Sequence, residues 1–294
     1  MEKIYNFFTL KMETPPSFGW FHLLFVLITI AVTTFLCIKF KDCEDRIFRR
    51  ITLICWIIMV VFEIYKQLFH AATYENGIYT YNWYYFPFQL CSTPFYVLPF
   101  VAFMKDNKIR DYFTSFISTF AFFGGLVVFA YPNDVFVETI GINIQTMVHH
   151  GLQLVLGIYF AVYNRKRLGI KYYLKSIPVF IACLVLAVAL NEIVHNSLVK
   201  IGNDDDFSMF YISPYVENHL PILSVVYAAV DWILFFLAYT VGFCIAAILM
   251  LYAMIGGIKL ANLINSKVKN NLKAQPAGVD VEVQVNTDNE NAQK

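Results

Sequence analysis

The sequence is poor in charged residues. Asp, Glu, Lys and Arg make up 15% of its 294 residues, whereas a soluble domain carries about 25%. Hydrophobic residues reach 59% and aromatic residues 18%. Lys and Arg do not combine with aromatic residues into a basic helix or patch, so nucleic acid is not an expected partner. The shortage of charge is typical of a chain that is surrounded mostly by lipid.

The sequence also lacks paired cysteines and internal repeats. No Cys-x-x-Cys spacing occurs, and all the cysteines but one fall within apolar segments, so a disulfide framework is not expected. The absence of repeats counts against transporter folds built from two related halves. No pattern specifies an oligomeric state. The six cysteines are Cys37, Cys43, Cys55, Cys91, Cys183 and Cys244.

Long apolar segments predict an all-α membrane protein with seven transmembrane helices. A spanning helix needs about 20 mostly apolar residues. The second and third segments are more polar than the others, and they are included because charged loops flank them. We expect residues 1–266 to form the transmembrane domain and the polar residues 267–294 a disordered cytoplasmic tail. The predicted spans are 18–38, 51–72, 83–104, 112–131, 143–163, 174–198 and 223–255.

The distribution of basic residues predicts how the chain is oriented. Lys and Arg are concentrated in the loops after the first, third and fifth spans and at the start of the tail. The alternate loops are mainly acidic. Because basic loops stay on the cytoplasmic side, this pattern predicts an N-terminus outside the cell and a C-terminus in the cytoplasm.

Polar side chains within the spans mark a candidate site, because such groups are costly in hydrocarbon. At about 1.5 Å of helix rise per residue, those of several spans fall in one layer in the outer half of the membrane. We expect the layer to line a polar cavity that opens outward. Alternatively, single members only bond neighbouring helices, and Glu63 with Lys66 only neutralise each other. The layer contains Glu63, Lys66, His70, Gln89, Cys91, His149, His150, Asn191, Glu192, His195 and Asp231.

Cys91 is a candidate nucleophile within this layer. A thiol becomes nucleophilic when a nearby base takes its proton, and His149 and His150 lie at the same depth on another span. About 100° of helix rotation separates adjacent residues, so the two histidines are expected to have different roles. Gly151 is expected to allow a close approach to Cys91.

Other members of the layer are candidates for supporting roles. Glu192 or Asp231 is placed to orient the imidazole of the base. Gln89 or Lys66 is placed to stabilise the oxyanion that forms when a thiolate attacks an ester.

The sequence around these residues resembles a known family. Residues 86–91 read Phe-Pro-Phe-Gln-Leu-Cys, and His150-Gly151 follows two spans later. With Asn191 and residues 207–214, these motifs resemble the YwaF-like bacterial membrane proteins, which are related to the eukaryotic transmembrane protein 164. The resemblance covers residues 18–260.

The resemblance implies a lipid acyltransferase in a bacterial cell membrane. In such an enzyme Cys91 would carry an acyl chain as a thioester, and His150 or His149 would act as the base. The implied substrate is a membrane phospholipid, and no cofactor is implied.

A zinc-dependent lipid hydrolase is a second interpretation of the same layer. His70, His195 and one histidine of the 149–150 pair lie on three different spans at similar depth. Three protein ligands with an open fourth position suit a catalytic zinc ion.

A third interpretation is a solute transporter or a sensor. An outward-facing polar cavity can bind a solute without any chemistry. In this interpretation Glu63, Lys66 and Asp231 would matter more than Cys91.

Overall fold

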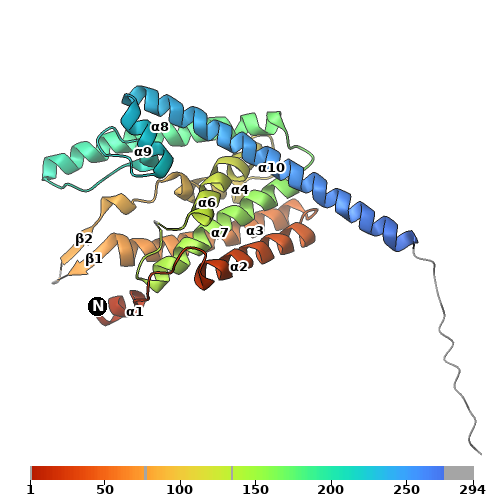
Figure 1. Ribbon diagram of the computed structural model, residues 1–294, viewed down its shortest axis with the longest axis horizontal. Helices are drawn as coiled ribbons and strands as arrows, with labels where there is room; N and C mark the ends of the chain where they lie inside the picture. Colours follow the sequence, from red (N-terminus) through yellow and green to blue (C-terminus); the bar gives the residue numbers. More distant parts are fainter. Residues whose placement is uncertain (1, 76–77, 134, 275–294) are drawn as a thin grey trace, which may run out of the picture. The chain divides into compact units, whose positions relative to one another are not determined.

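The computed structural model describes residues 2–75, 78–133 and 135–274, which are mostly helical (Figure 1). The described residues up to Gly256 form one compact body, and those from Gly257 to Ala274 belong to a second unit. The α-helices are α1 (Glu2–Phe8), α2 (Trp20–Lys39), α3 (Asp45–Lys66), α4 (Pro94–Phe103), α5 (Arg110–Phe116), α6 (Phe122–Ala130), α7 (Ile140–Tyr163), α8 (Ile170–Ile201), α9 (Pro221–Ala229) and α10 (Trp232–Ala274).

Short elements connect or extend these helices. A hairpin of two antiparallel strands follows α3, with Ala72 opposite Tyr81 and Thr73 opposite Thr80. These elements are η1 (Gln67–Ala71), β1 (Ala72–Glu75), β2 (Ile78–Tyr81), η2 (Trp83–Tyr85), η3 (Leu90–Ser92), η4 (Ile117–Ala121) and η5 (Met209–Tyr211).

Several helices can cross a bilayer. Within the described residues, four helical segments are long and apolar enough: Trp20–Lys39, Arg110–Ala130, Ile170–Ile201 and Trp232–Val268. Two further helices, α3 with 22 residues and α7 with 24, would be about 33 and 36 Å long, but they are more polar. The helical, membrane-spanning character of the fold is therefore confirmed, and the number of seven spans stays a prediction.

The third predicted span, 83–104, is not one continuous helix. Proline lacks a backbone N–H and restricts the residue before it, and both Pro87 and Pro94 fall in this segment. The chain passes through η2, extended residues and η3 before α4 begins with Pro94 in its first turn, where proline is tolerated. The full-length helix predicted here is wrong, because α4 has only 10 residues.

The seventh predicted span, 223–255, is divided into α9 and α10. Val230 adopts an extended conformation, with φ −138° and ψ 163°. The next residue, Asp231, accepts hydrogen bonds from the backbone N–H groups of Ile233 at 2.9 Å and Leu234 at 3.1 Å. A side chain that accepts such bonds caps a helix, so Asp231 starts α10.

Helix α10 extends into the predicted tail. Helix α10 has 43 residues and continues to Ala274, so residues 267–274 are helical rather than disordered. The rest of the predicted tail, 275–294, lies outside the described residues.

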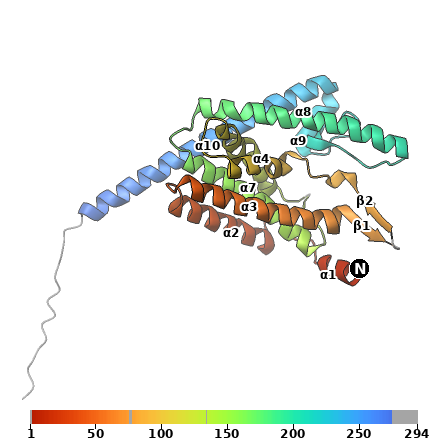
Figure 2. The ribbon, with the colours of Figure 1, turned by 180° about the vertical axis from the view of Figure 1, so that it is seen from behind.

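Helix α7 is the central helix of the body. It packs against α2, α3 and α6, and it lies within the bundle in both views (Figures 1 and 2). Its polar side chains are therefore buried in protein instead of facing lipid, which explains why this segment is less apolar than the others. The buried polar residues of α7 are Asn143, Gln145, Thr146, His149, His150 and Gln153.

Ion pairs hold one end of the body together. Arg110, whose side chain is 2% exposed, binds Asp45 at 2.5 Å and Asp106 at 3.0 Å. Arg167 binds Asp106 and also Asp111, the latter at 2.9 Å. The Arg167 guanidinium holds the pKa of Asp106 below its ordinary value. These contacts join the loops after α2, α4 and α7, which are the first, third and fifth loops of the predicted topology.

Candidate active site

Cys91 lies in the turn η3, immediately before α4. Gln89 donates a hydrogen bond from Nε2 to the carbonyl oxygen of Ser208 at 2.8 Å, which ties this turn to the segment after α8. The aromatic rings of Phe88 and Phe210 pack together beside it, with centroids 6.0 Å apart. Cys91 thus precedes the first turn of α4, and the start of a helix carries partial positive charge.

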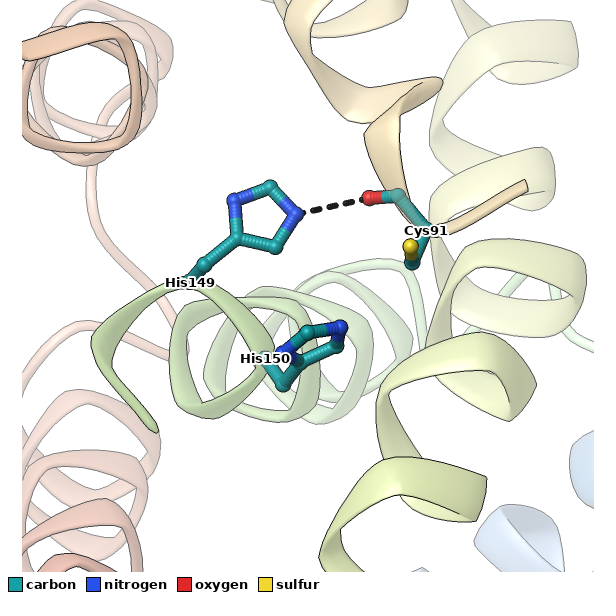
Figure 3. Close-up of side chains that lie close together, drawn as sticks. All are labelled: Cys91, His149 and His150. Atoms are coloured by element: carbon teal, nitrogen blue, oxygen red, sulfur yellow. Dashed lines mark hydrogen bonds between the residues drawn. The ribbon is translucent and has the colours of Figure 1, made fainter. Parts of the chain in front are cut away.

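Helix α7 places His149 against the backbone of Cys91 (Figure 3). The His149 Nε2 atom lies 2.8 Å from the Cys91 carbonyl oxygen, and Gln153 donates to the same oxygen from its Nε2. A carbonyl oxygen can only accept hydrogen bonds, so His149 carries its proton on Nε2. His149 therefore holds the Cys91 backbone in place.

His150 has the opposite tautomer. Its Nδ1 atom lies 2.8 Å from the Thr146 carbonyl oxygen, which again can only accept. The proton is therefore on Nδ1, and Nε2 keeps a free lone pair. Figure 3 shows the tip of the His150 ring directed toward Cys91.

The three side chains form one compact group. The Cys91 sulfur and a ring nitrogen of each histidine all lie within 4.8 Å of one another. The two rings are nearly perpendicular, at 82°, with centroids 5.0 Å apart. The predicted proximity of Cys91 to the histidines is therefore found, with His149 on the backbone and His150 open toward the thiol.

Glycines of α6 make this close packing possible. A Cβ atom on Gly125 would lie 2.8 Å from the Gln153 Cβ and 3.0 Å from the His150 carbonyl oxygen, and one on Gly124 would lie 3.7 Å from the Cys91 Cα. Gly151, predicted to face Cys91, instead packs against Thr29. That prediction is wrong because Gly151 points toward α2.

Replacing Gly125 with alanine is expected to destabilise the protein by about 1–3 kcal/mol through overpacking. Gly242 on α10 is a matched control, since no atom lies within 4 Å of the position of its added Cβ. In thermal unfolding of detergent-solubilised protein, the melting temperature should fall for Gly125→Ala and should not fall for Gly242→Ala. Equal melting temperatures for the two variants would contradict this packing.

The predicted pair of Glu63 and Lys66 forms and joins a buried network. The Lys66 Nζ atom lies 3.6 Å from Glu63 Oε1, and Gln67 donates to the same oxygen at 2.6 Å. Gln145, one turn before His149 on α7, donates to Glu63 Oε2 at 3.5 Å. The carboxylate is thus compensated within the bundle, next to the Cys91 group.

The candidates on α8 lie elsewhere. Asn191 is buried and pairs with the Met209 backbone through two hydrogen bonds of 2.6 and 3.1 Å. Glu192 is exposed and accepts a bond from the Tyr215 hydroxyl at 2.6 Å. His195 stacks on the same Tyr215, with ring centroids 3.8 Å apart. These residues shape the segment after α8 and do not belong to the Cys91 group.

Two further candidates also lie outside the group. Asp231 is exposed and caps α10. His70 is half-buried beside the ring of Tyr85, with centroids 4.4 Å apart. The imidazoles are oriented by the carbonyl groups of Thr146 and Cys91, so the predicted orienting roles of Glu192 and Asp231 are wrong.

The zinc interpretation can be compared with this geometry. Among the residues that the structure describes, the group of potential metal ligands consists of Cys91, His149 and His150. His70 and His195 are not part of it, so the three-helix histidine set does not form. Within the group, His149 directs Nε2 to a carbonyl oxygen, and only His150 offers a lone pair toward the sulfur.

Gln153 and the glycine pair of α6 were not among the predicted site residues. Gln153 was visible as a polar residue four positions after His149, which places it on the same helix face. Gly124 and Gly125 carried a weaker signal, because adjacent small residues in an apolar span often mark a close helix contact.

These features define the class of the protein and then its family. Apolar helices surround a buried polar cluster, so the chain is a multi-pass helical membrane protein. It belongs to the TMEM164 family, whose model matches residues 17–254, more than half of its length. No curated protein and no solved structure matches the chain. The predicted relation to transmembrane protein 164 is confirmed, and the finer resemblance to bacterial YwaF-like proteins stays a prediction.

Proposed function

We propose that the protein is an intramembrane acyltransferase, or a thioester-forming lipid hydrolase, that acts on membrane phospholipids. The observation that supports it is the group of Cys91, His149 and His150, whose sulfur and ring nitrogens lie within 4.8 Å of one another. A cysteine paired with a base is the usual arrangement for covalent acyl transfer. The lone pair on His150 Nε2, left free by the bond from Nδ1 to Thr146, makes this ring the base.

The reaction has two balanced halves. His150 takes the thiol proton, and the Cys91 sulfur attacks the carbonyl carbon of a phospholipid ester. The carbon–oxygen ester bond breaks, a thioester forms, and His150 returns the proton to the departing alkoxide. A hydroxyl group of an acceptor lipid, or water, then gives its proton to His150 and attacks the thioester. The carbon–sulfur bond breaks, and the sulfur regains a proton.

An apolar groove beside the group supports a lipid substrate. The groove has a volume of about 280 Å³ and lies between α2, α6 and α7. One of its residues, Leu154, follows His150 by four positions, so it lies about 6 Å further along α7. An acyl chain can thus lie next to the base. The groove is lined by Thr29, Ile30, Thr33, Thr34, Phe122, Leu126, Leu154 and Ile158.

A trapped thioester tests the proposal. Purified protein is incubated with phospholipid that carries an isotope-labelled acyl chain, quenched in acid and digested. We expect the label on the peptide that contains Cys91, and we expect neutral hydroxylamine to remove it. An active preparation in which the label never reaches Cys91 would refute the mechanism.

We also propose seven membrane crossings with the N-terminus outside, in a bacterial cell membrane. The supporting observation is that the three basic loops share one end of the body, where ion pairs join them. Single cysteines introduced at Lys108 and at Lys200 should react with a membrane-impermeant maleimide from opposite sides of the membrane. Labelling of both positions from one side would refute this topology.

The transporter interpretation has less support from the geometry. It required Asp231 to face a polar cavity, whereas Asp231 is exposed and caps α10. It also gives weight to Glu63 and Lys66, whereas the carboxylate of Glu63 is bound by Lys66 and Gln67 within the bundle. No observation of the structure favours solute binding over acyl transfer.

A further inference from the structure

A charged pocket lies at the end of the body opposite to the first residues of α7. Its volume is about 230 Å³. Three loops enclose it, which are those between α2 and α3, between α4 and α5, and between α7 and α8. The lining residues are Lys41, Asp42, Cys43, Asp106, Tyr163, Asn164, Arg165, Lys166 and Arg167.

The two arginines of this pocket, Arg165 and Arg167, bind the loops that surround it. Arg165 binds Asp42 and donates to the carbonyl oxygens of Lys41 at 2.9 Å and Val162 at 3.1 Å. It therefore fastens the loop after α2 to the end of α7. Arg167 is held by Asp106 and by Asp111 of α5. Both guanidinium groups are neutralised by carboxylates, so they shape the pocket but leave little charge for a ligand.

Two lysines supply the unneutralised charge. Lys41 and Lys166 both line the pocket and are exposed. Among the residues that the structure describes, neither forms a salt bridge, whereas both arginines do. The pocket thus carries four cations against two carboxylates, and the excess belongs to ammonium groups that are free to donate. An ammonium group is a common partner of phosphate oxygens.

The pocket is separate from the Cys91 group. Asn164 follows His150 by 14 residues on α7 and its cap, which corresponds to about 21 Å along the helix. A phosphate in the pocket therefore cannot belong to a lipid whose ester lies at Cys91. The site is additional to the one in the proposed function.

The surroundings of the pocket favour a lipid over a solute. The spanning helix α2 ends here, at Lys39, and the spanning helix α8 begins here, at Ile170. The side chains of Ile38 and Ile170 next to the pocket are 65% and 47% exposed, and they suit the hydrocarbon beside a headgroup. Basic residues at the ends of membrane helices attract anionic lipids.

We propose that this pocket binds the phosphate of an anionic phospholipid headgroup through Lys41 and Lys166. The acyl chains of this lipid lie along the apolar ends of α2 and α8. The bound lipid is not consumed, and it adds a further link between three loops that ion pairs and hydrogen bonds already join.

Lipid binding to the full-length chain tests the proposal. The protein is placed in nanodiscs of phosphatidylcholine with increasing phosphatidic acid, and retained lipids are counted by native mass spectrometry. Lys41→Ala with Lys166→Ala is expected to weaken retention of phosphatidic acid by about tenfold or more. Lys105→Ala with Lys108→Ala is the matched control, because these exposed lysines share the same end and loop region but do not line the pocket. The control should retain the lipid as the unaltered protein does.

Three results would overturn the proposal. Equal losses in both double variants would mean that general surface charge attracts the lipid. Unchanged retention in the Lys41 and Lys166 variant would exclude these residues. Displacement of the lipid by inorganic phosphate at millimolar concentration, with phosphate bound in its place, would assign the pocket to free phosphate. Thioester formation at Cys91 is measured on the same samples. This second measurement shows whether the proposed function fails independently of lipid binding in the pocket.

Discussion

Replacing Cys91 with alanine is expected to reduce acyl transfer by about 10³-fold or more, since loss of a covalent nucleophile removes the main reaction path. The fold should survive, because Cys91 is only half-buried and alanine leaves no large cavity. The backbone contacts of Cys91 with His149 and Gln153 use its carbonyl oxygen and do not need the thiol. Product formation from labelled phospholipid, measured in proteoliposomes, checks the result.

Other cysteines provide the control for this variant. Cys55 and Cys183 are buried in the apolar core, where a cysteine acts as a small hydrophobic residue. Alanine at either position should cost some stability but should leave turnover per folded molecule unchanged. The mechanism fails if Cys91→Ala keeps full turnover, or if Cys55→Ala loses it while the protein stays folded.

Replacing His150 with glutamine is expected to reduce turnover by about 10² to 10⁴-fold, the usual contribution of a general base. Glutamine fills a similar volume, but its amide cannot take a proton from the Cys91 thiol. His149→Gln is the matched comparison. An amide Nε2 can replace the imidazole Nε2 as the donor to the Cys91 carbonyl oxygen, so this variant should keep most of its activity.

The rate profile with pH distinguishes the two histidines further. If His150 is the base, the acidic limb of the profile should vanish in His150→Gln and persist in His149→Gln. The assignment is contradicted if His149→Gln is the inactive variant. Such a result would mean that the His149 imidazole leaves the Cys91 carbonyl oxygen during the reaction, rotates and serves as the base.

The sequence allowed the Cys91 group to be predicted because two kinds of information agreed. The topology placed Cys91 and the two histidines at one depth, and the short motifs around them resembled a family in which they act together. The separate roles of His149 and His150 also followed in part, since adjacent helical residues point in different directions. Hydrogen bonds of the two imidazoles to the carbonyl oxygens of Cys91 and Thr146 decide which ring faces the thiol. No sequence pattern specifies these bonds.

Depth alone misled the prediction at other positions. Glu192 and Asp231 have the expected distance from the ends of their segments, but both side chains are exposed. A depth count fixes the position along a helix and leaves the direction of the side chain open. The sequence also places Asp231 in the middle of a span, because the break at Val230 has no proline or glycine to indicate it. The broken third span, by contrast, could have been foreseen from Pro87 and Pro94.

The Cys91 carbonyl oxygen accepts hydrogen bonds from both His149 and Gln153, and this affects the hydrogen bonding of the turn η3. A carbonyl that accepts two hydrogen bonds becomes more polarised, and the adjoining amide N–H becomes a stronger donor. That amide belongs to Ser92, which donates to the Gln89 carbonyl oxygen at 2.8 Å. The side chains of His149 and Gln153 therefore reinforce a hydrogen bond that neither of them touches. Through this cooperative polarisation, helix α7 is expected to stiffen the backbone of a neighbouring element, and slow hydrogen exchange at the Ser92 amide would show it.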